Sequence, residues 1–201
     1  MICFHNPQEE NGYLSNWDMS EFTVDGIKFS SMEQYMMYEK ALLFQDQETA
    51  AKILQTDNVS EIKALGRAVQ HFDNKIWIKM REEIVYRGML EKFRQNPELA
   101  EKLEQTGEDI IAECAVKDRI WGIGLSMKDE NRLCIDKWRG QNLLGKVLMR
   151  VREDIRHQNK VDRAFQSVEK AFSGVAEDAG FYTEADLQDY AKKIRHEEEK
   201  E

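Results

Sequence analysis

The segment 30–44, SSMEQYMMYEKALLF, places two opposite charges on a helical pattern that is otherwise apolar. Glu33 and Lys40 stand seven residues apart, so at about 100° per residue they share one side of a helix with Met37. Tyr35 falls on the opposite side, and a helix that is apolar on two sides is expected to be buried on both. The two charges are therefore predicted to face something other than bulk water.

A direct salt bridge between these two side chains is excluded, because seven residues make about 10.5 Å of helical rise. Either each charge has its own partner, or both line one polar cavity. Buried charges are costly, have shifted pKa values and are typical of functional sites, where a desolvated lysine can attack as a free amine. The alternatives are structural: Lys40 as an ion-paired lysine, and Glu33 as a helix cap in a Ser30–Glu33 capping box rather than a Ser31–Gln34 one.

The elements that would position these residues give a mainly α pattern. Segment 22–31, FTVDGIKFSS, has two alternating runs joined by Asp25-Gly26, a strong hairpin signal. Helical patterns cover 31–45, 47–56, 60–70, 74–95, 97–106 and 141–155, while 109–116 could form a strand and 117–140 a loop. The prediction is a compact multihelical domain with a small N-terminal β-hairpin.

Composition limits the class of protein. The chain has 201 residues, 41% of them hydrophobic, which fits one globular domain with an appendage. No run approaches the ~18 apolar residues of a membrane helix, and the N-terminus turns polar too early for a signal peptide. The cysteines Cys3, Cys114 and Cys134 are odd in number and lack metal-ligand spacing. We therefore expect a cytoplasmic protein without a structural metal.

The charge balance restricts the partners. With 29 basic and 38 acidic residues the net charge is −9, which argues against a protein that coats nucleic acid by neutralising phosphates. The negative net charge does not exclude binding of a small nucleotide, or of one modified base presented by DNA.

Residues 157–201 are predicted to form a separate acidic extension after a domain of residues 1–156. Six basic and eleven acidic residues lie in 161–201, over two amphipathic helical patterns at 161–178 and 184–198 that are broken at Gly180. Thr183 and Asp186 match a capping box for the second pattern. The extension is either a solvated appendage or an element for self-association or partner binding through 161–198.

Six motifs stand in the order in which they occur in the NADAR family of YbiA-like proteins. They are YLSNW (13–17), FSSMEQYMMYEKA (29–41), the Gly-Arg, Trp-x3-Arg and Lys-Phe stations within 62–99, LEQTGEDIIAE (103–113), DRIWGIGL (118–125) and WRGQNLLGKVLMRVR (138–152). Residues 4–155 thus resemble this family. Trp17 replaces a usual Phe and Val85 a common Met, which are both apolar exchanges, and the extension lies outside the family's core.

The resemblance implies a compact, mostly helical fold that binds nucleotides of the NAD and ADP-ribose type and hydrolyses a ribose C1–N bond without a cofactor. The first substrate class is ADP-ribose attached to guanine in nucleic acid. The second is a ribosylamino-pyrimidine phosphate of riboflavin synthesis. A third alternative is a non-catalytic module that binds ADP-ribose. For the enzyme, Lys40 would form a Schiff base with the opened ribose, and Glu33 would carry a proton or hold the sugar hydroxyls.

Three further candidates lie in the WGIG motif and before it. Asp118 fits a site acid or a turn residue, and Trp121 fits a base-stacking residue or a core tryptophan. Gly122 belongs to the same predicted substrate-binding loop. The GxG at 122–124 does not open a βαβ unit, so it is not a dinucleotide fingerprint.

The remaining candidates have equally open alternatives. Asn16 would bind substrate or fix its loop, and Arg67 would contact phosphate or form an ion pair. Asn142 lies at a predicted helix start, where free N–H groups favour a phosphate, although it also fits a plain N-cap. Glu113 fits a structural role as well as a functional one.

Overall fold

The computed structural model describes residues 1–178, 183, 185–186, 188–189 and 192. The chain divides into two compact units, Met1–Arg156 and His157–Glu201. The fold is mainly α, as predicted, and none of the described helices is both long and apolar enough to cross a membrane. The helices are α1 (Met32–Leu43), α2 (Gln47–Ile53), α3 (Val59–Arg67), α4 (Asn74–Gln95), α5 (Pro97–Gln105) and α6 (Leu143–Asp178), with short 3-10 turns η1 (Gly12–Leu14), η2 (Glu130–Leu133) and η3 (Ile135–Lys137).

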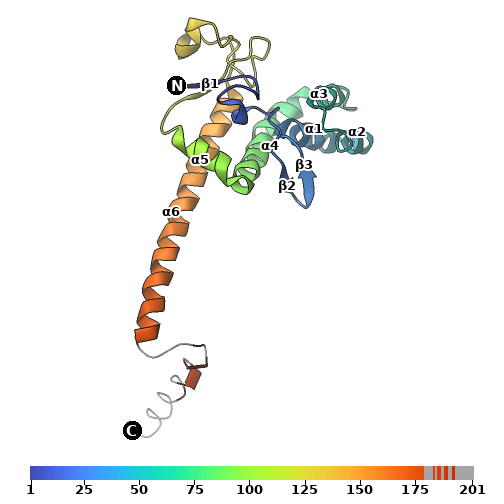
Figure 1. The fold of residues 1–201 in the computed structure, drawn as a ribbon. Coiled ribbons are helices and arrows are strands. Elements are labelled where there is room, and N and C mark those ends of the chain that lie inside the picture. Colours follow the sequence, from blue (N-terminus) through green and yellow to red (C-terminus); the bar gives the residue numbers. More distant parts are fainter. Residues whose placement is uncertain (179–182, 184, 187, 190–191, 193–201) are drawn as a thin grey trace. The chain divides into compact units, whose positions relative to one another are not determined.

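The predicted hairpin is formed by β2 (Phe22–Val24) and β3 (Ile27–Phe29), which are antiparallel with Phe22 opposite Phe29. Asp25 and Gly26 both have positive φ, at 50° and 79°, which is the backbone of the tight hairpin turns. The inner face packs on α1, where the rings of Phe22 and Phe29 lie 5.9 Å and 5.2 Å from that of Tyr35. Figure 1 shows the hairpin beside α1 and α4.

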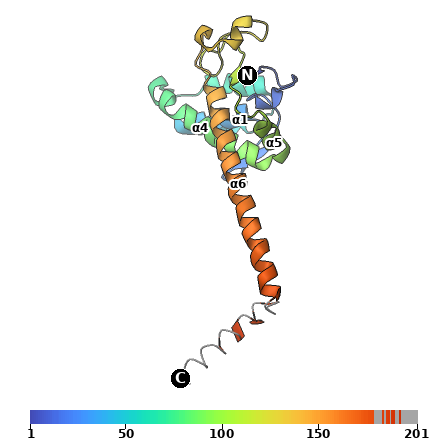
Figure 2. The same ribbon diagram turned by 90° about the vertical axis from the view of Figure 1, so that its left-hand side faces the viewer.

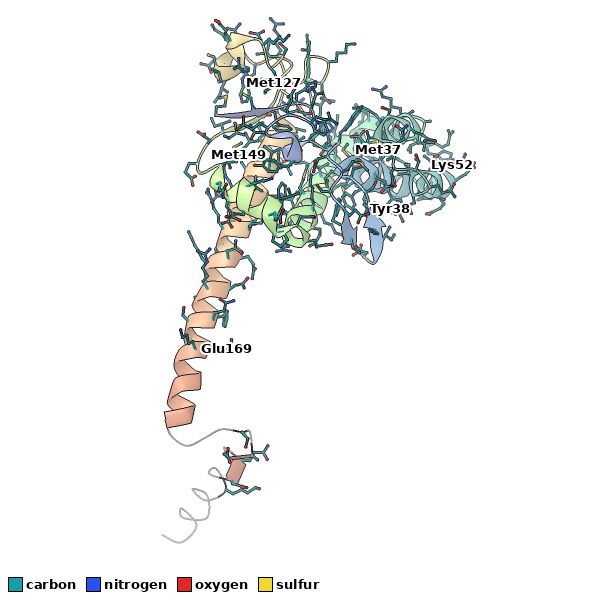
Figure 3. The ribbon with its side chains drawn as sticks, in the orientation of Figure 1. Met37, Tyr38, Lys52, Met127, Met149 and Glu169 are labelled. Atoms are coloured by element: carbon teal, nitrogen blue, oxygen red, sulfur yellow. The ribbon has the colours of Figure 1, made fainter. Side chains whose placement is uncertain are left out.

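Helix α1 is the centre of the first unit and contacts α2, α3 and α4. Its residues Met32 to Met37 are all buried, so it is enclosed on nearly every side. Figure 3 marks Met37 and Tyr38 on α1 and Lys52 on the neighbouring α2.

A second, parallel pairing joins β1 (Ile2–Phe4) to β4 (Ile111–Glu113), with Cys3 opposite Ala112. Helix α6 follows β4 after a long loop that contains η2 and η3. It is bonded to α4 through Tyr86, whose hydroxyl donates to the Asp154 carboxylate at 2.9 Å. Figure 2 shows α4 and α5 beside this part of α6. Both ends of residues 1–156 are thus bonded to neighbouring elements, β1 to β4 and α6 to α4.

The extension differs from the prediction in one respect. The two predicted helices 141–155 and 161–178 are one continuous α6, because residues 156–160 (RHQNK) contain neither Gly nor Pro to end the helix. The capping box at Thr183 and Asp186 is present, with mutual hydrogen bonds of 2.7–3.3 Å. Gly180 and most of 184–198 lie outside the described residues. Association through this segment stays a prediction, although Phe165 and Val168 are exposed apolar residues on α6.

We predict that residues 1–156 fold without the extension. Arg156, the last residue of the first unit, already donates to the carbonyl oxygens of Gly107 at 2.5 Å and Glu104 at 3.1 Å, so a chain that ends there keeps these contacts. Thermal unfolding followed by circular dichroism should stay cooperative, with Tm lowered by no more than about 2–4 °C, the effect of about 1 kcal/mol at this size. A truncated chain without a cooperative transition would contradict the boundary.

Candidate active site

The helix cap at the N-terminus of α1 is made by the Ser31 side chain and not by the Glu33 side chain. Ser31 is the N-cap and accepts a hydrogen bond from the Gln34 backbone N–H at 3.3 Å, while the Gln34 side chain accepts from the Ser30 N–H at 2.7 Å. The backbone N–H of Glu33 donates to the Asn16 carbonyl oxygen at 2.8 Å. The capping alternative for Glu33 is therefore wrong.

Glu33 and Lys40 line one cavity of about 200 Å³, hereafter the Lys40 cavity, together with Met36 and Met37 from the same helix. Helix α3 forms the facing wall at Gly66, which also lines the cavity. A Cβ on Gly66 would lie 1.9 Å from the Met37 sulfur, so only glycine allows α3 to approach α1 this closely. Glu33 and Lys40, which their spacing places on one side of the helix, thus face one cavity.

Glu33 is almost completely desolvated, with 2% of its surface exposed. Burial raises the pKa of this carboxyl above its usual range, and the charge of Lys63 and a hydrogen bond from the Trp17 side chain oppose that rise. Asp118 adds a repulsive charge and Arg67 an attractive one. The environment therefore favours a carboxyl that can take up and release a proton.

Lys40 is half-buried and has a carbonyl rather than a carboxylate as its partner. Its Nζ donates to the Gly66 carbonyl oxygen at 2.6 Å and lies 4.3 Å from the centre of the Phe72 ring. Burial lowers the pKa of this amine, and the charge of Glu33 opposes that shift. Within the part of the chain that the structure describes, no ion pair holds Lys40, so the prediction of a simple ion-paired lysine is wrong.

The segment 13–18 forms another wall and is fixed by a buried lysine. Asn16 lines the Lys40 cavity and is 6% exposed, and its Oδ1 has no hydrogen-bond partner among the described residues. Lys92 on α4 is 0% exposed; its Nζ donates to the Tyr13 carbonyl oxygen at 2.8 Å and to Asp18 at 3.1 Å. Asn16 is thus presented to the cavity by a segment that Lys92 holds in place.

The opposite wall comes from β4 and the loop after it. Asp118 and Trp121 line the Lys40 cavity, and Asp118 Oδ1 also accepts hydrogen bonds from the N–H groups of Ile120 and Trp121, both at 2.8 Å. Asp118 therefore serves as the turn residue while its carboxylate borders the cavity. Glu113, at the end of β4, lines the cavity as well.

A second hollow of about 490 Å³, hereafter the His5 cavity, adjoins the first. The two share the lining residues Ser15, Trp17, Lys63, Arg67, Glu113 and Asp118. Lys63 and Arg67 lie one turn apart on α3, and Lys117 lines the His5 cavity from the loop after β4. The two cavities therefore offer cations and the Trp17 ring next to the carboxyl groups.

Two of the sequence-predicted residues lie elsewhere. Asn142 is 1% exposed and lines neither cavity; its side chain donates to the Ile111 carbonyl oxygen at 2.8 Å and accepts from the Glu113 N–H at 3.1 Å. Gly122 also lies behind the wall, where a Cβ would meet the Glu113 carbonyl oxygen at 2.9 Å. Both residues position β4 and its loop, so we correct their predicted substrate contacts to structural roles.

Trp17 and Lys63 line both cavities but were not among the candidate residues. Glu113 also lines both cavities, and the sequence left it open between a structural and a functional role. Lys63 could have been found from its spacing of four before Arg67, which places both on one face of a helix. The role of Glu113 could not be decided from the sequence, because a strand of three residues gives no signal for which face meets a cavity. Among the described residues, no group of three or more His, Cys, Asp or Glu side chains is placed to hold a metal ion.

We predict that Lys92→Met destabilises the first unit. The change leaves Asp18, which is 20% exposed, and the Tyr13 carbonyl oxygen without their buried partner, and breaking such a pair typically costs about 3–5 kcal/mol. Chemical denaturation measures the free energy of unfolding, with the exposed Lys75→Met as control. A loss no larger than that of the control would show that Lys92 does not hold segment 13–18.

A family model and several known proteins match most of the first unit. The model of the NADAR domain matches residues 3–156. An N-glycosidase from Acanthamoeba polyphaga mimivirus is 43% identical over 161 residues, which cover 76% of this chain and 95% of that protein. A riboflavin biosynthesis protein from Vibrio vulnificus is 32% identical over 77% of this chain, but the match spans only 38% of that protein.

A solved structure is also similar. The NMR structure of the Escherichia coli protein YbiA matches with a TM-score of 0.66 and 25% sequence identity, over 79% of this chain and 86% of that chain. Several curated relatives carry the name N-glycosidase. On this evidence the chain belongs to the NADAR family, and at the level of that family it is a hydrolase of glycosidic bonds.

Proposed function

We propose that this chain is an N-glycosidase that releases ADP-ribose from guanine in ADP-ribosylated nucleic acid. The observation that carries the proposal is the Lys40 cavity, where an amine and a carboxyl on one stripe of α1 are both desolvated yet not paired with each other. The adjoining His5 cavity, with Lys63, Arg67 and Lys117 on its walls, suits the phosphates of a nucleotide.

Lys40 is the proposed nucleophile. Cleavage of an N-glycosidic bond builds positive charge at ribose C1, and a neutral amine can attack that carbon. Because burial lowers the pKa of Lys40, a larger fraction of free amine is present than for an exposed lysine. Attack breaks the bond to the base nitrogen and gives a glycosylamine at C1. Opening of the sugar ring converts it to a Schiff base, and water then releases the sugar and restores the amine.

Glu33 is proposed to act beside the nucleophile. Its raised pKa suits a group that exchanges protons, and its place on the same stripe suits contact with the sugar hydroxyls. Asn16, with an unpartnered Oδ1, would accept a hydrogen bond from the substrate, and Trp121 would stack on the base. Arg67 would contact phosphate, and Asp118 would border the reacting sugar.

The alternative substrate is a ribosylamino-pyrimidine phosphate. The Vibrio vulnificus relative, a riboflavin biosynthesis protein, favours this candidate. Such a substrate carries a shorter phosphate portion, so it would make less use of the His5 cavity than ADP-ribose would. The comparison of the two substrates therefore tests which class this chain serves.

We predict that the purified chain releases ADP-ribose from DNA that is ADP-ribosylated on guanine, without added metal or NAD. Mass spectrometry of the DNA should show loss of the modification. Hydrolysis of the ribosylamino-pyrimidine phosphate, measured in parallel, should have a lower kcat/KM. A higher kcat/KM for the ribosylamino-pyrimidine phosphate would instead make that compound the substrate of this chain. Activity that disappears with a chelator and returns with zinc or magnesium would contradict the metal-free mechanism.

We also predict that Lys40→Met abolishes turnover while ADP-ribose still binds. Methionine nearly matches the lysine stem in volume but lacks the amine. The matched control is Lys52→Met on α2 (Figure 3), since Lys52 is 52% exposed and pairs with Glu48, an interaction worth little. Single-turnover kinetics and calorimetric titration with ADP-ribose separate chemistry from binding. A folded Lys40→Met variant with near-normal turnover would end the nucleophile assignment.

A further inference from the structure

Glu113 is held more firmly than any other carboxyl at the two cavities. It ends β4, where it pairs in register with Phe4 of β1. Its N–H donates to the Asn142 side chain at 3.1 Å, and its carbonyl oxygen accepts from the Ile123 N–H at 2.8 Å. The backbone is therefore fixed from the β1, α6 and loop sides, and the side chain lines both cavities.

Within the described residues, the Glu113 carboxyl group lacks a hydrogen-bond partner for one of its oxygens. Its Oε2 is buried and has no hydrogen-bond partner within the described part of the chain, and no ion pair involves it there. A bare carboxylate in such a place is costly, whereas the neutral acid is tolerated. Burial, then repulsion by Asp118, raises the pKa of Glu113 to about 8; Lys63 opposes the rise and Glu33 adds to it.

The other two carboxyl groups at the cavities have hydrogen-bond donors beside them. Asp118 Oδ1 accepts two backbone N–H groups. Glu33 has the charge of Lys63 and the Trp17 hydrogen bond beside it. Among the three carboxyl groups, Glu113 is therefore the one with a buried oxygen that has no hydrogen-bond partner within the described residues, which favours its neutral, proton-carrying form.

We propose that Glu113 is the catalytic general acid that protonates the departing nitrogen. The inference rests on the proposed N-glycosidase function. An amine is a poor leaving group as an anion, so the nitrogen must gain a proton as the C1–N bond breaks. The bonding electron pair goes to the nitrogen, the Glu113 proton moves to it, and C1 bonds to the Lys40 amine. Water that hydrolyses the Lys40 Schiff base supplies the oxygen of the released sugar and returns a proton to Glu113.

This assignment gives the three groups different tasks on different elements. Lys40 and Glu33 come from α1 and act at the sugar carbon, while Glu113 comes from β4 and lines the boundary that both cavities share. Both substrate candidates lose an amine nitrogen, so the role of Glu113 is the same for either one.

The test is the pH dependence of kcat/KM for the full chain. Because the reaction needs protonated Glu113, kcat/KM of the unsubstituted protein should fall as pH rises through about 8. Glu113→Gln should lower kcat by about 10²–10⁴-fold. Its pH profile should also lack this fall of kcat/KM at high pH, which is the descending limb of the profile. Glu113→Asp, which keeps an acid on a shorter stem, should recover part of the rate and the limb.

Two controls separate this role from a structural one. Glu39→Gln removes another carboxyl whose pKa burial raises, but Glu39 borders neither cavity, so rate and limb should stay unchanged. The charged and titratable groups that line the two cavities with Glu113 are Glu33, Lys40, Lys63, Arg67, Lys117, Asp118 and, at the His5 cavity, His5. His5→Gln should keep the descending limb, which distinguishes His5 titration from that of Glu113.

The outcomes are distinct. An unsubstituted protein that cleaves neither substrate overturns the proposed function and this inference together. An active protein whose Glu113→Gln variant keeps the rate and the descending limb overturns only the inference. Should Glu113→Gln not fold, ¹³C NMR of the glutamate-labelled unsubstituted protein decides: a carboxyl titrating near pH 8 supports the assignment, and none above pH 6 overturns it.

Discussion

Burial of α1 on nearly every side is the constraint from which the site follows. A charged side chain on such a helix must leave water, and the cost shifts its pKa toward the neutral form. Glu33 and Lys40 accordingly shift in opposite directions, the carboxyl upward and the amine downward. Seven residues of separation keep them from neutralising each other by direct contact. The helix thus presents a proton-exchanging acid and a partly neutral amine to one cavity, which is a requirement of the proposed chemistry.

The rest of the first unit closes that cavity with walls of different chemistry. Gly66 lets α3 approach Met37, which brings Lys63 and Arg67 to the rim. Lys92 secures segment 13–18, and Asn142 secures β4, so that polar groups with no catalytic role of their own determine where the reactive ones lie. The Lys92 and Asn142 side chains make these hydrogen bonds from buried positions, and losing one partner leaves the other unsatisfied, which makes the site sensitive to changes outside it.

Much of this could be predicted from local patterns. The hairpin at Asp25-Gly26, the boundaries of α4 and the shared stripe of Glu33 and Lys40 follow from turn chemistry and helical periodicity, which are properties of neighbouring residues. For Asn142 and Glu113, such reasoning named candidates but could not decide between a structural and a functional role. Their positions depend on the parallel pairing of β1 with β4, which joins residues more than a hundred positions apart. A three-residue strand carries too little periodicity to indicate which side chain faces a cavity.

The most direct test of the central claim is to trap the bond between Lys40 and the substrate. Borohydride added during turnover of ADP-ribosylated DNA reduces a Schiff base to a stable secondary amine, and peptide mass spectrometry locates it. The account predicts the mass of the reduced ADP-ribosyl group on the peptide that contains Lys40. Rapid turnover with no mass added to that peptide would contradict a covalent role for Lys40 and leave the amine as an electrostatic or acid group.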